Sequence, residues 1–422
     1  MANSNKILIA TYYRFPCSQS VLENVFAKEL GRTNSIYMLF KGKGLRRNIL
    51  RWHNSCVILC REIPTNTPLR TFLNRLFHSK LFDISIFYSI INLISRNKIK
   101  IVCVRDMPLI TLLLFPLRPF LKFKIYYQYS APMGDIKIGY SYALKNLNRL
   151  LFWLLGHLLN ILTKLVLKKS DIIFPISEYL KKEIVEKSKV NITRIIPLTM
   201  GIDKYFILRR PNSIPFLDEL HKENFLIVYF GTLSFARNPQ FIIQVFAKFK
   251  ENHNKCKLLI IGKTQYEWEK KQLIRTCKTL KVNNDVIFTG LLQQNLLFDY
   301  ISCCDVSLSA IPPESYYRIS SPTKLYESLG IGLPVIGNKG ILEQEKVLKE
   351  SGGGFLVDYD VDEFSNAIAT LMLNKGIRKK MSKKGKKYIL NNYSYQAIAK
   401  KISPYFENSF STDAKKADLS KF

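Results

Sequence analysis

Hydrophobic and polar positions follow two periods along this chain. Short runs of β-branched and aromatic residues alternate with longer stretches in which apolar residues recur three or four positions apart. The short runs predict strands that are buried on both faces, and the longer stretches predict amphipathic helices. Expected in the first half are a helix at 21–30 and strands at 6–10, 56–59, 99–104, 124–129, 172–175 and 194–196.

The pattern pauses in the middle of the chain and then restarts. Residues 209–224 are polar and contain two prolines, which predicts an interdomain linker. Two stretches of alternating strands and helices predict two α/β domains with parallel sheets, at 1–208 and 225–392. Expected in the second domain are helices at 240–249, 265–280 and 362–372, and strands at 226–230, 258–261, 286–288, 306–308, 334–336 and 355–357.

The end of the chain predicts one more helix. Residues 393–408 have a helical pattern, which Pro404 is expected to kink or to end early, and residues 409–422 resemble a loose polar tail. Two Rossmann-like domains in succession predict a cleft in which the strand ends of both can face one ligand.

The charge points to anionic partners. The chain has 64 Lys and Arg against 32 Asp and Glu, a net charge of +32. Residues 1–205 hold 32 basic and 11 acidic residues, a net of +21, and the remainder holds 32 and 21, a net of +11. Nucleic acid, an acidic lipid surface and a diphosphate-bearing substrate all fit such an excess, which by itself does not choose among them.

The cysteines predict buried, reduced thiols rather than disulfides or a metal site. They lie mostly inside apolar runs, without histidines at metal-site spacing. We therefore expect a cytosolic protein, and residues 1–13 do not resemble a signal peptide. The eight are Cys17, Cys56, Cys60, Cys103, Cys256, Cys277, Cys303 and Cys304.

Two segments could contact a membrane. Residues 150–167 are strongly apolar with one polar stripe, which fits either a buried helix of the first domain, where His157 is structural, or a helix at a membrane interface. Residues 41–52 could form a short basic helix on an anionic surface, or a solvated loop. Its charges are Lys41, Lys43, Arg46, Arg47 and Arg51, ahead of Trp52.

Residues 320–336 carry the strongest chemical signal. Ser321 is a good N-cap, and Pro322 suits a first helical turn. The amides at this helix start and Lys324 form an anion site. Glu327, one turn further, can accept hydrogen bonds from two vicinal hydroxyls such as those of a ribose. Together these features predict a site for a nucleoside diphosphate.

This segment resembles the donor-binding signature of family-4 retaining glycosyltransferases, which have the GT-B fold. The resemblance implies that Glu327 binds the ribose of a nucleotide sugar with uridine or guanosine as its base. It is carried by Pro322, Lys324, Glu327, Gly332, Pro334 and Val335.

A second match lies near residue 231. There Gly231 and Thr232 follow a strand, and Arg237 stands where the family usually has a lysine that clamps the donor's diphosphate. The resemblance implies that Arg237 and Lys324 are the catalytic cations. The expected donor-binding residues are Gly231, Thr232, Gly262, Leu291, Ser320, Ser321, Thr323 and Glu327.

The chain also departs from the family's pattern. Ile319 stands where the signature has a first glutamate, and Glu314 is the nearest acid. The loop at 12–20 lacks the usual glycines, so that Ser18 or Ser20 would take their place. The stretch 128–132 lacks the histidine that many relatives have. We expect the acceptor side to involve Ser18, Asp106 and Ser130.

The sequence therefore predicts a GT-B glycosyltransferase whose terminal helix crosses back to the first domain. It would move a sugar from a UDP or GDP sugar, with retention, to a glycan or lipid-linked acceptor in cell-surface polysaccharide or glycolipid assembly. No metal or cofactor is expected besides the donor. The expected place is the cytoplasmic face of a membrane, and no nucleic-acid-binding motif is present. A nucleotide-sugar epimerase on the same fold and a non-catalytic GT-B partner subunit are the alternatives.

Overall fold

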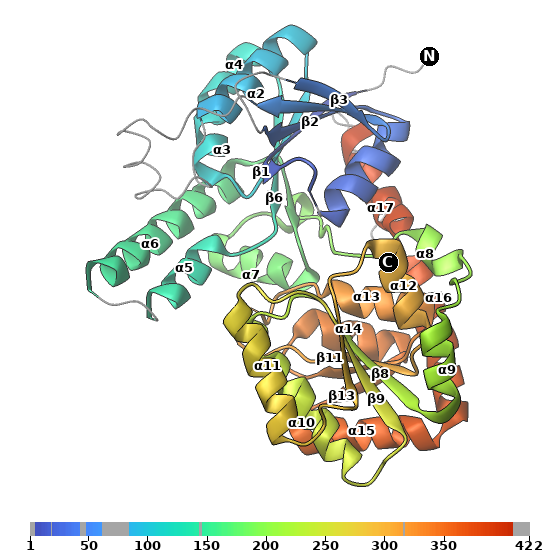
Figure 1. Ribbon diagram of the computed structural model, residues 1–422. Coiled ribbons are helices and arrows are strands. Elements are labelled where there is room, and N and C mark those ends of the chain that lie inside the picture. The colour runs from blue at the N-terminus through green and yellow to red at the C-terminus, as the bar shows by residue number, and fades with distance from the viewer. Residues whose placement is uncertain are drawn as a thin grey trace. The chain divides into compact units, whose positions relative to one another are not determined.

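The computed structural model describes residues 5–17, 19–42, 48–60, 84–142, 146–314 and 317–407. The chain divides into two compact units (Figure 1). The first contains Met1–Thr199 together with Ile398–Phe422, and the second contains Met200–Ala397.

The first unit is built on a seven-stranded sheet with the order β3-β4-β2-β1-β5-β6-β7. Every neighbouring pair is parallel except β3 with β4. The strands are β1 (Lys6–Arg14), β2 (Ser35–Lys41), β3 (Asn48–Trp52), β4 (Ser55–Cys60), β5 (Ile101–Arg105), β6 (Lys124–Tyr129) and β7 (Ile172–Pro175). The strand order reverses between β1 and β5, and ligands bind beyond the carboxyl ends of the strands at such a reversal.

Helices cover this sheet. The longest is α6, which forms a hairpin with α5 (Figure 1). The helices are α2 (Ile84–Asn97), α3 (Pro108–Leu114), α4 (Arg118–Leu121), α5 (Met133–Tyr142), α6 (Asn146–Lys169) and α7 (Glu178–Ser188). The π-type helix η1 (Val21–Glu29) and the short 3₁₀ turns η2 (Leu30–Arg32), η3 (Phe115–Leu117) and η4 (Ile192–Arg194) complete the set.

The structure corrects two predictions in the first unit. A basic helix at 41–52 is wrong for its described part, because β3 pairs with β4 and Trp52 packs edge-on against Phe15 and Phe40. Lys43, Arg46 and Arg47 lie outside the described residues. The strand expected at 194–196 is only a single bridge from Ile195, since the Asn191 side chain accepts from the Thr193 amide and holds the preceding residues in a 3₁₀ turn.

The terminal helix α17 (Tyr395–Glu407) returns to the first unit, as the sequence predicts. Phe406 is fully buried there and stacks on Phe174 with a centroid distance of 5.6 Å. The Tyr126 hydroxyl donates to the Tyr405 carbonyl at 2.6 Å. The helix does not end at Pro404 but continues to Glu407, because these contacts hold the residues beyond the proline.

The second unit has a six-stranded parallel sheet with the order β10-β9-β8-β11-β12-β13. This is the doubly wound order, and its reversal lies between β8 and β11. Its strands are β8 (Phe225–Phe230), β9 (Cys256–Ile261), β10 (Val286–Gly290), β11 (Val306–Ser309), β12 (Val335–Asn338) and β13 (Gly354–Val357).

Helices surround this sheet as well, as the alternating pattern predicts. They are α8 (Lys204–Leu208), α9 (Pro215–Glu223), α10 (Pro239–Lys250), α11 (Glu267–Thr279), α12 (Gln294–Ser302), α13 (Thr323–Ile331), α14 (Leu342–Ser351), α15 (Val361–Leu373) and α16 (Lys375–Asn392), with the 3₁₀ turn η5 (Phe235–Arg237).

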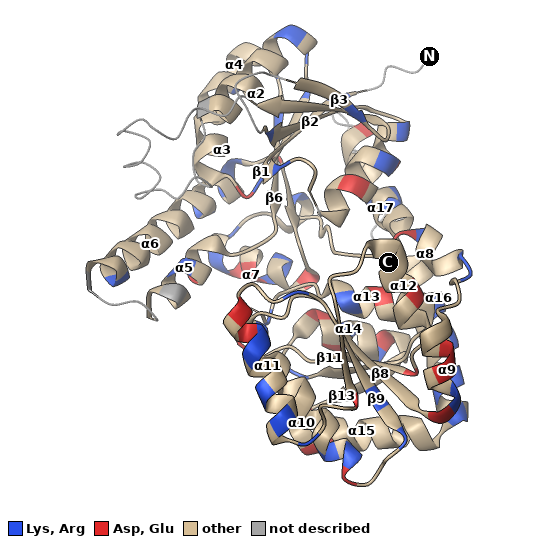
Figure 2. Cartoon of the chain, in the orientation of Figure 1, with Lys and Arg blue, Asp and Glu red and all other residues tan. Residues whose placement is uncertain are grey.

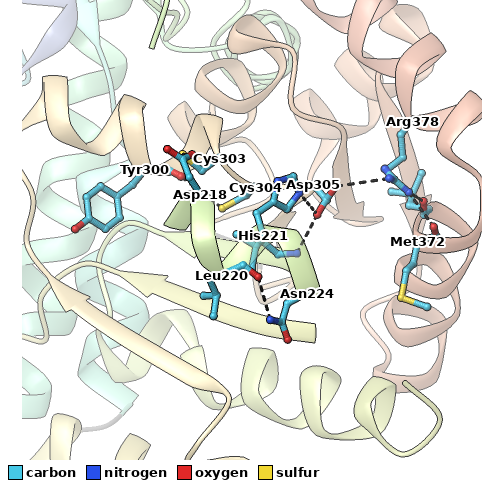
Figure 3. A network of polar contacts seen from close by, with 12 residues as sticks. Asp218, Leu220, His221, Asn224, Tyr300, Cys303, Cys304, Asp305, Met372 and Arg378 are labelled. Carbon is cyan, nitrogen blue, oxygen red and sulfur yellow. Dashed lines mark hydrogen bonds and ion pairs between the residues drawn. The ribbon is translucent and has the colours of Figure 1, made fainter. Parts of the chain in front are cut away.

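The segment expected to be a linker is part of the second unit. Helix α9 occupies most of it, and Leu217 is completely buried in the core of that unit. Figure 3 shows a second attachment, in which Asp305 receives hydrogen bonds from His221 of α9 and from the Leu226 amide at 3.0 Å each. Arg378 of α16 approaches the same carboxylate at 3.6 Å. The unit boundary therefore falls at Thr199/Met200 rather than after residue 208.

Candidate functional site

Three glycines lie at the carboxyl ends of three adjacent strands of the second unit, β8, β9 and β10. Gly231, Gly262 and Gly290 all have positive φ, at 126°, 150° and 75°. The Gly231 amide donates to the Ile261 carbonyl, and the Gly262 amide donates to the Gly290 carbonyl, both at 2.9 Å. A Cβ on Gly262 would lie 1.9 Å from the Gly231 carbonyl oxygen. Only a residue without a side chain fits there, so the turns after β8 and β9 approach each other closely.

Lys324 lies in the first turn of α13 and reaches the end of β8. Its ammonium nitrogen lies 3.7 Å from the centroid of the Tyr229 ring. A Cβ on Gly231 would lie 3.6 Å from its Cε. Since α13 follows β11 and Gly231 follows β8, this side chain bridges the two loops at the sheet's reversal point. That is the position at which doubly wound sheets bind ligands.

The surroundings of Lys324 disfavour the charged form of its ammonium group. Burial and, to a smaller extent, repulsion from Arg237 lower its pKa, attraction to Glu327 opposes both, and the resulting pKa is about 7. The guanidinium carbon of Arg237 lies 4.1 Å from the centroid of the Tyr317 ring. Two cations are therefore held close together on aromatic faces, and an anion between them would relieve their repulsion.

Glu327 lies one helical turn after Lys324. Burial raises the pKa of its carboxyl to about 8, and Lys324 counteracts part of that rise. Hydrogen bonds donated by hydroxyl groups would stabilise the ionised form of this buried carboxyl group. The structure thus brings together Arg237, Lys324 and Glu327, which the sequence analysis assigned to diphosphate and ribose.

The structure corrects the expected N-cap of α13 and shows what the serines before this helix contact. The N-cap of the helix is Pro322 rather than Ser321. The Ser321 hydroxyl is buried, accepts from the Met200 amide at 3.1 Å and bonds the Tyr326 hydroxyl at 2.8 Å. The amide and hydroxyl of Ser320 both donate to the Tyr317 carbonyl. The amides of Thr323 and Lys324, in the first turn, have no acceptor within the helix and are suited to an anion.

The other expected donor contacts lie at the same strand ends or in the loop before α13. Thr232 and Leu291 follow directly after Gly231 and Gly290, and both side chains are exposed. Glu314 is exposed, and its carbonyl accepts from the Tyr317 amide at 2.9 Å. Ile319 is half-buried, and its side chain has no polar atom to offer a sugar.

The first unit joins two of the three expected acceptor-side residues. Asp106 follows β5 and Ser130 follows β6, and both the amide and the hydroxyl of Ser130 donate to the Asp106 carboxylate. Asp106 has a φ of 52°, in the left-handed region that is sparsely populated by residues other than glycine. Burial raises the pKa of its carboxyl, against the opposing charge of Arg105. Ser18 lies outside the described residues.

A pocket adjoins Asp106. Its walls are mainly aromatic rings of the strand ends and residues of α5 and α6. These tyrosines were not predicted from the sequence, although the aromatic residues of the run at 124–129 were a usable signal. The lining includes Tyr12, Asp106, Tyr127, Tyr129, Met133, Lys137 and Leu159.

The thiols and acids of the described residues do not form a metal site. No group of three or more His, Cys, Asp or Glu side chains in this part of the chain could hold a metal ion. All eight cysteines are free, and five of them, Cys60, Cys103, Cys256, Cys277 and Cys304, are buried.

Most of the second unit is similar to a known sequence family. Residues 214–388 match the family model described as glycosyl transferases group 1. The match contains Arg237, Lys324 and Glu327, whereas Asp106 and its pocket lie outside it.

Curated relatives are distant and only partly covered. Two uncharacterised glycosyltransferases of Methanocaldococcus jannaschii are 27% identical over 172 residues and 23% identical over 248 residues. The first alignment covers 40% of this chain and 40% of the relative, and the second covers 58% and 60%. The chain thus spans between two fifths and three fifths of the length of the curated relatives it matches.

Solved structures match almost the whole chain. Sucrose-phosphate synthase of Thermosynechococcus elongatus has a TM-score of 0.70 at 14% identity, over 97% of this chain and 100% of its own. HepE of Anabaena in complex with UDP has a TM-score of 0.70 at 13% identity, over 96% and 100%. A glycosyltransferase involved in lipopolysaccharide biosynthesis, WaaG, has 0.67 at 13%, over 95% and 99%. These likenesses confirm the predicted GT-B fold class of two parallel-sheet α/β domains.

Proposed function

We propose that this protein is a glycosyltransferase that uses a nucleoside diphosphate sugar, with uridine or guanosine as the base. The observation that carries the proposal is the pair of Lys324 and Arg237 at the reversal point of the second sheet. Burial and mutual repulsion there lower the pKa of the Lys324 ammonium to about 7. Such a pair favours a ligand with two adjacent negative charges, and a diphosphate carries them.

The same pair supports a role in the reaction itself. In glycosyl transfer the bond between the anomeric carbon and the diphosphate oxygen breaks, a bond to the acceptor oxygen forms, and the acceptor's hydroxyl proton passes to the departing diphosphate. Negative charge grows on the diphosphate as it leaves. Cations already fixed beside it stabilise that charge without reorganising, and this lowers the barrier. Lys324 and Arg237 would do this together with the first-turn amides of α13.

Glu327 would select the nucleoside part of the donor. Its carboxylate lies one turn from Lys324, so it can accept hydrogen bonds from the two ribose hydroxyls while Lys324 holds the phosphates. Support for a nucleotide sugar also comes from HepE, whose solved structures contain UDP, and UDP-glucose. The family model and the curated relatives support glycosyltransferase activity at a coarser level.

For the acceptor we propose a glycan or a lipid-linked sugar in polysaccharide or glycolipid assembly, recognised by the first unit. Asp106 can accept a hydrogen bond from an acceptor hydroxyl, and the tyrosines of the adjoining pocket offer flat apolar faces suited to a sugar ring. Transfer with retention follows from the resemblance of residues 322–335 to the family-4 signature.

A panel of UDP and GDP sugars tests this function. Each is incubated with the protein and a mixture of polyprenyl-phosphate-linked acceptors, and the released nucleoside diphosphate is measured. Release with one donor, lost in Lys324→Met, is the expected result, and NMR of the product gives its anomeric configuration. Conversion of the donor sugar without nucleotide release would indicate an epimerase instead. Donor binding without turnover would indicate a non-catalytic partner subunit.

A further inference from the structure

A continuous apolar stripe runs along the solvent side of α6. Its side chains recur every three or four residues, and each is between 43% and 77% exposed. With a rise of about 1.5 Å per residue the stripe is about 27 Å long. It is made of Leu147, Leu150, Leu154, Leu158, Ile161 and Leu165.

The opposite side of α6 is fixed to its own unit. Leu155, Leu159 and Val166 are buried there. A Cβ on Gly156 would lie 2.5 Å from Ile138 of α5, so the two helices touch at this glycine. The interpretation of residues 150–167 as a buried helix therefore holds for one side of α6 only.

This packing bears on how α6 could meet a membrane. The helix is long and apolar enough to cross one by length and composition, and 28% of its most apolar window is buried. A helix that packs on protein along its inner side cannot be surrounded by lipid. It can lie in the plane of a bilayer with its outer side down.

The borders of the stripe carry positive charge. Arg149, Lys164 and Lys168 are exposed, and α6 contains no Asp or Glu, as Figure 2 shows by the absence of red along it. Trp153 is 40% exposed and lies against His157, with the ring centroids 4.3 Å apart. Trp prefers the headgroup level of a bilayer, and Lys and Arg are attracted to anionic headgroups.

We propose that the outer face of α6 is a docking surface for an anionic lipid bilayer. The apolar stripe inserts among the acyl chains, while Arg149, Lys164 and Lys168 contact the headgroups. A second copy of this chain is a poorer occupant. Two α6 faces brought together would oppose basic residues with no acid on either helix to pair them. The surface lies on the first unit and does not depend on the proposed activity.

Flotation with phosphatidylcholine vesicles, with and without phosphatidylglycerol, tests the surface. The variant Leu154→Glu/Leu158→Glu changes two exposed side chains, so the fold should remain, and circular dichroism checks this. The matched control is Leu208→Glu/Leu373→Glu, two leucines exposed to a similar or greater degree on the second unit. Wild type and control should float with the anionic vesicles. The α6 variant should bind at least about tenfold more weakly, because affinity scales with inserted apolar area.

Three results would overturn the proposal. The first is flotation of the α6 variant equal to that of the control. The second is wild-type binding to neutral vesicles as strong as to anionic ones. The third is loss of binding in Lys379→Glu/Lys380→Glu on the basic helix α16 while the α6 variant still binds.

If sedimentation without lipid shows a dimer that only the α6 variant abolishes, and vesicle binding is unchanged, the stripe joins two copies instead. Nucleotide binding by the α6 variant should equal that of wild type, which separates this test from that of the proposed function.

Discussion

The Lys324 ammonium nitrogen lies 3.7 Å from the centroid of the Tyr229 ring, so a cation of helix α13 lies over an aromatic ring of strand β8. The ring face attracts a positive charge but does not neutralise it. Burial disfavours the charged form of this ammonium group and Arg237 repels it, so its pKa is lowered to about 7. Without an anion the two cations repel each other, and an anion bound beside both would offset that repulsion.

Donor affinity should depend on pH through Lys324. Only the protonated form attracts a diphosphate, and the free protein loses that proton as the pH rises through about 7. Affinity for UDP or GDP should therefore fall between pH 7 and pH 9, and binding in that range should take up a proton. Titration calorimetry in buffers of different ionisation enthalpy measures both. In Lys324→Arg, whose guanidinium stays protonated, the dependence should largely disappear. An unchanged pH profile in that variant would show that Lys324 is not the group responsible.

Glu327→Ala should weaken nucleoside diphosphate binding by about 2 kcal/mol, through the loss of charged hydrogen bonds to the ribose. The matched comparison uses the 2′-deoxynucleoside diphosphate with both proteins. The loss of affinity caused by Glu327→Ala should be about half as large for the deoxy ligand, since only one of the two hydroxyl bonds is left to lose. A loss of equal size for both ligands would mean that Glu327 contributes to folding of the site rather than to ribose recognition.

Gly262→Ala should destabilise the second unit and abolish nucleotide binding. The new Cβ would lie 1.9 Å from the Gly231 carbonyl, a contact with backbone that cannot move alone. We expect a loss of more than about 2 kcal/mol, seen as a lower thermal midpoint. Gly139→Ala is the control, because nothing lies within 4 Å of its added Cβ and alanine favours a helix. Equal midpoints for both variants would contradict the close approach of the two turns.

Asp106→Asn should reduce transfer to the acceptor while leaving nucleotide binding unchanged. Asparagine tolerates the φ of 52° and keeps one oxygen for the Ser130 amide, so the fold should persist. It cannot accept from both the Ser130 hydroxyl and an acceptor as a carboxylate can. The expected change is a lower kcat/KM for the acceptor at an unaltered donor affinity. A fall in donor affinity of the same size would place Asp106 outside acceptor recognition.

Much of the fold could be predicted because apolar periodicity is local. The strand at 226–230 needed only five consecutive apolar residues, and the helix at 240–249 needed only its own spacing. The strand β3 could not be found in this way, because Ile49 and Leu50 are exposed and their run is extended through pairing with β4. The place of residues 209–224 in the second unit could not be predicted either, because Leu217 is buried by contacts with residues distant in the sequence.

The candidate site was predicted in part for a similar reason. The charges that suit a diphosphate and a ribose can be read from the sequence alone, at Lys324, Glu327 and Arg237. The hydroxyl of Ser321, by contrast, is occupied by the Met200 amide, which lies 121 positions away in the chain. Such a competitor cannot be seen from a capping pattern. The pocket at Asp106 likewise draws its walls from β1, β6, α5 and α6.

Titration of the wild-type protein with UDP and with GDP, beside the variant Arg237→Ala/Lys324→Met, shows whether the two cations hold a nucleoside diphosphate. The proposed diphosphate site predicts that at least one of the two nucleotides binds the wild type. It also predicts that the double variant, with both cations removed from the site, binds that nucleotide at least about a hundredfold more weakly, a difference of about 2.7 kcal/mol. Equal affinity in the two proteins, or a folded wild type that binds neither nucleotide, would contradict it.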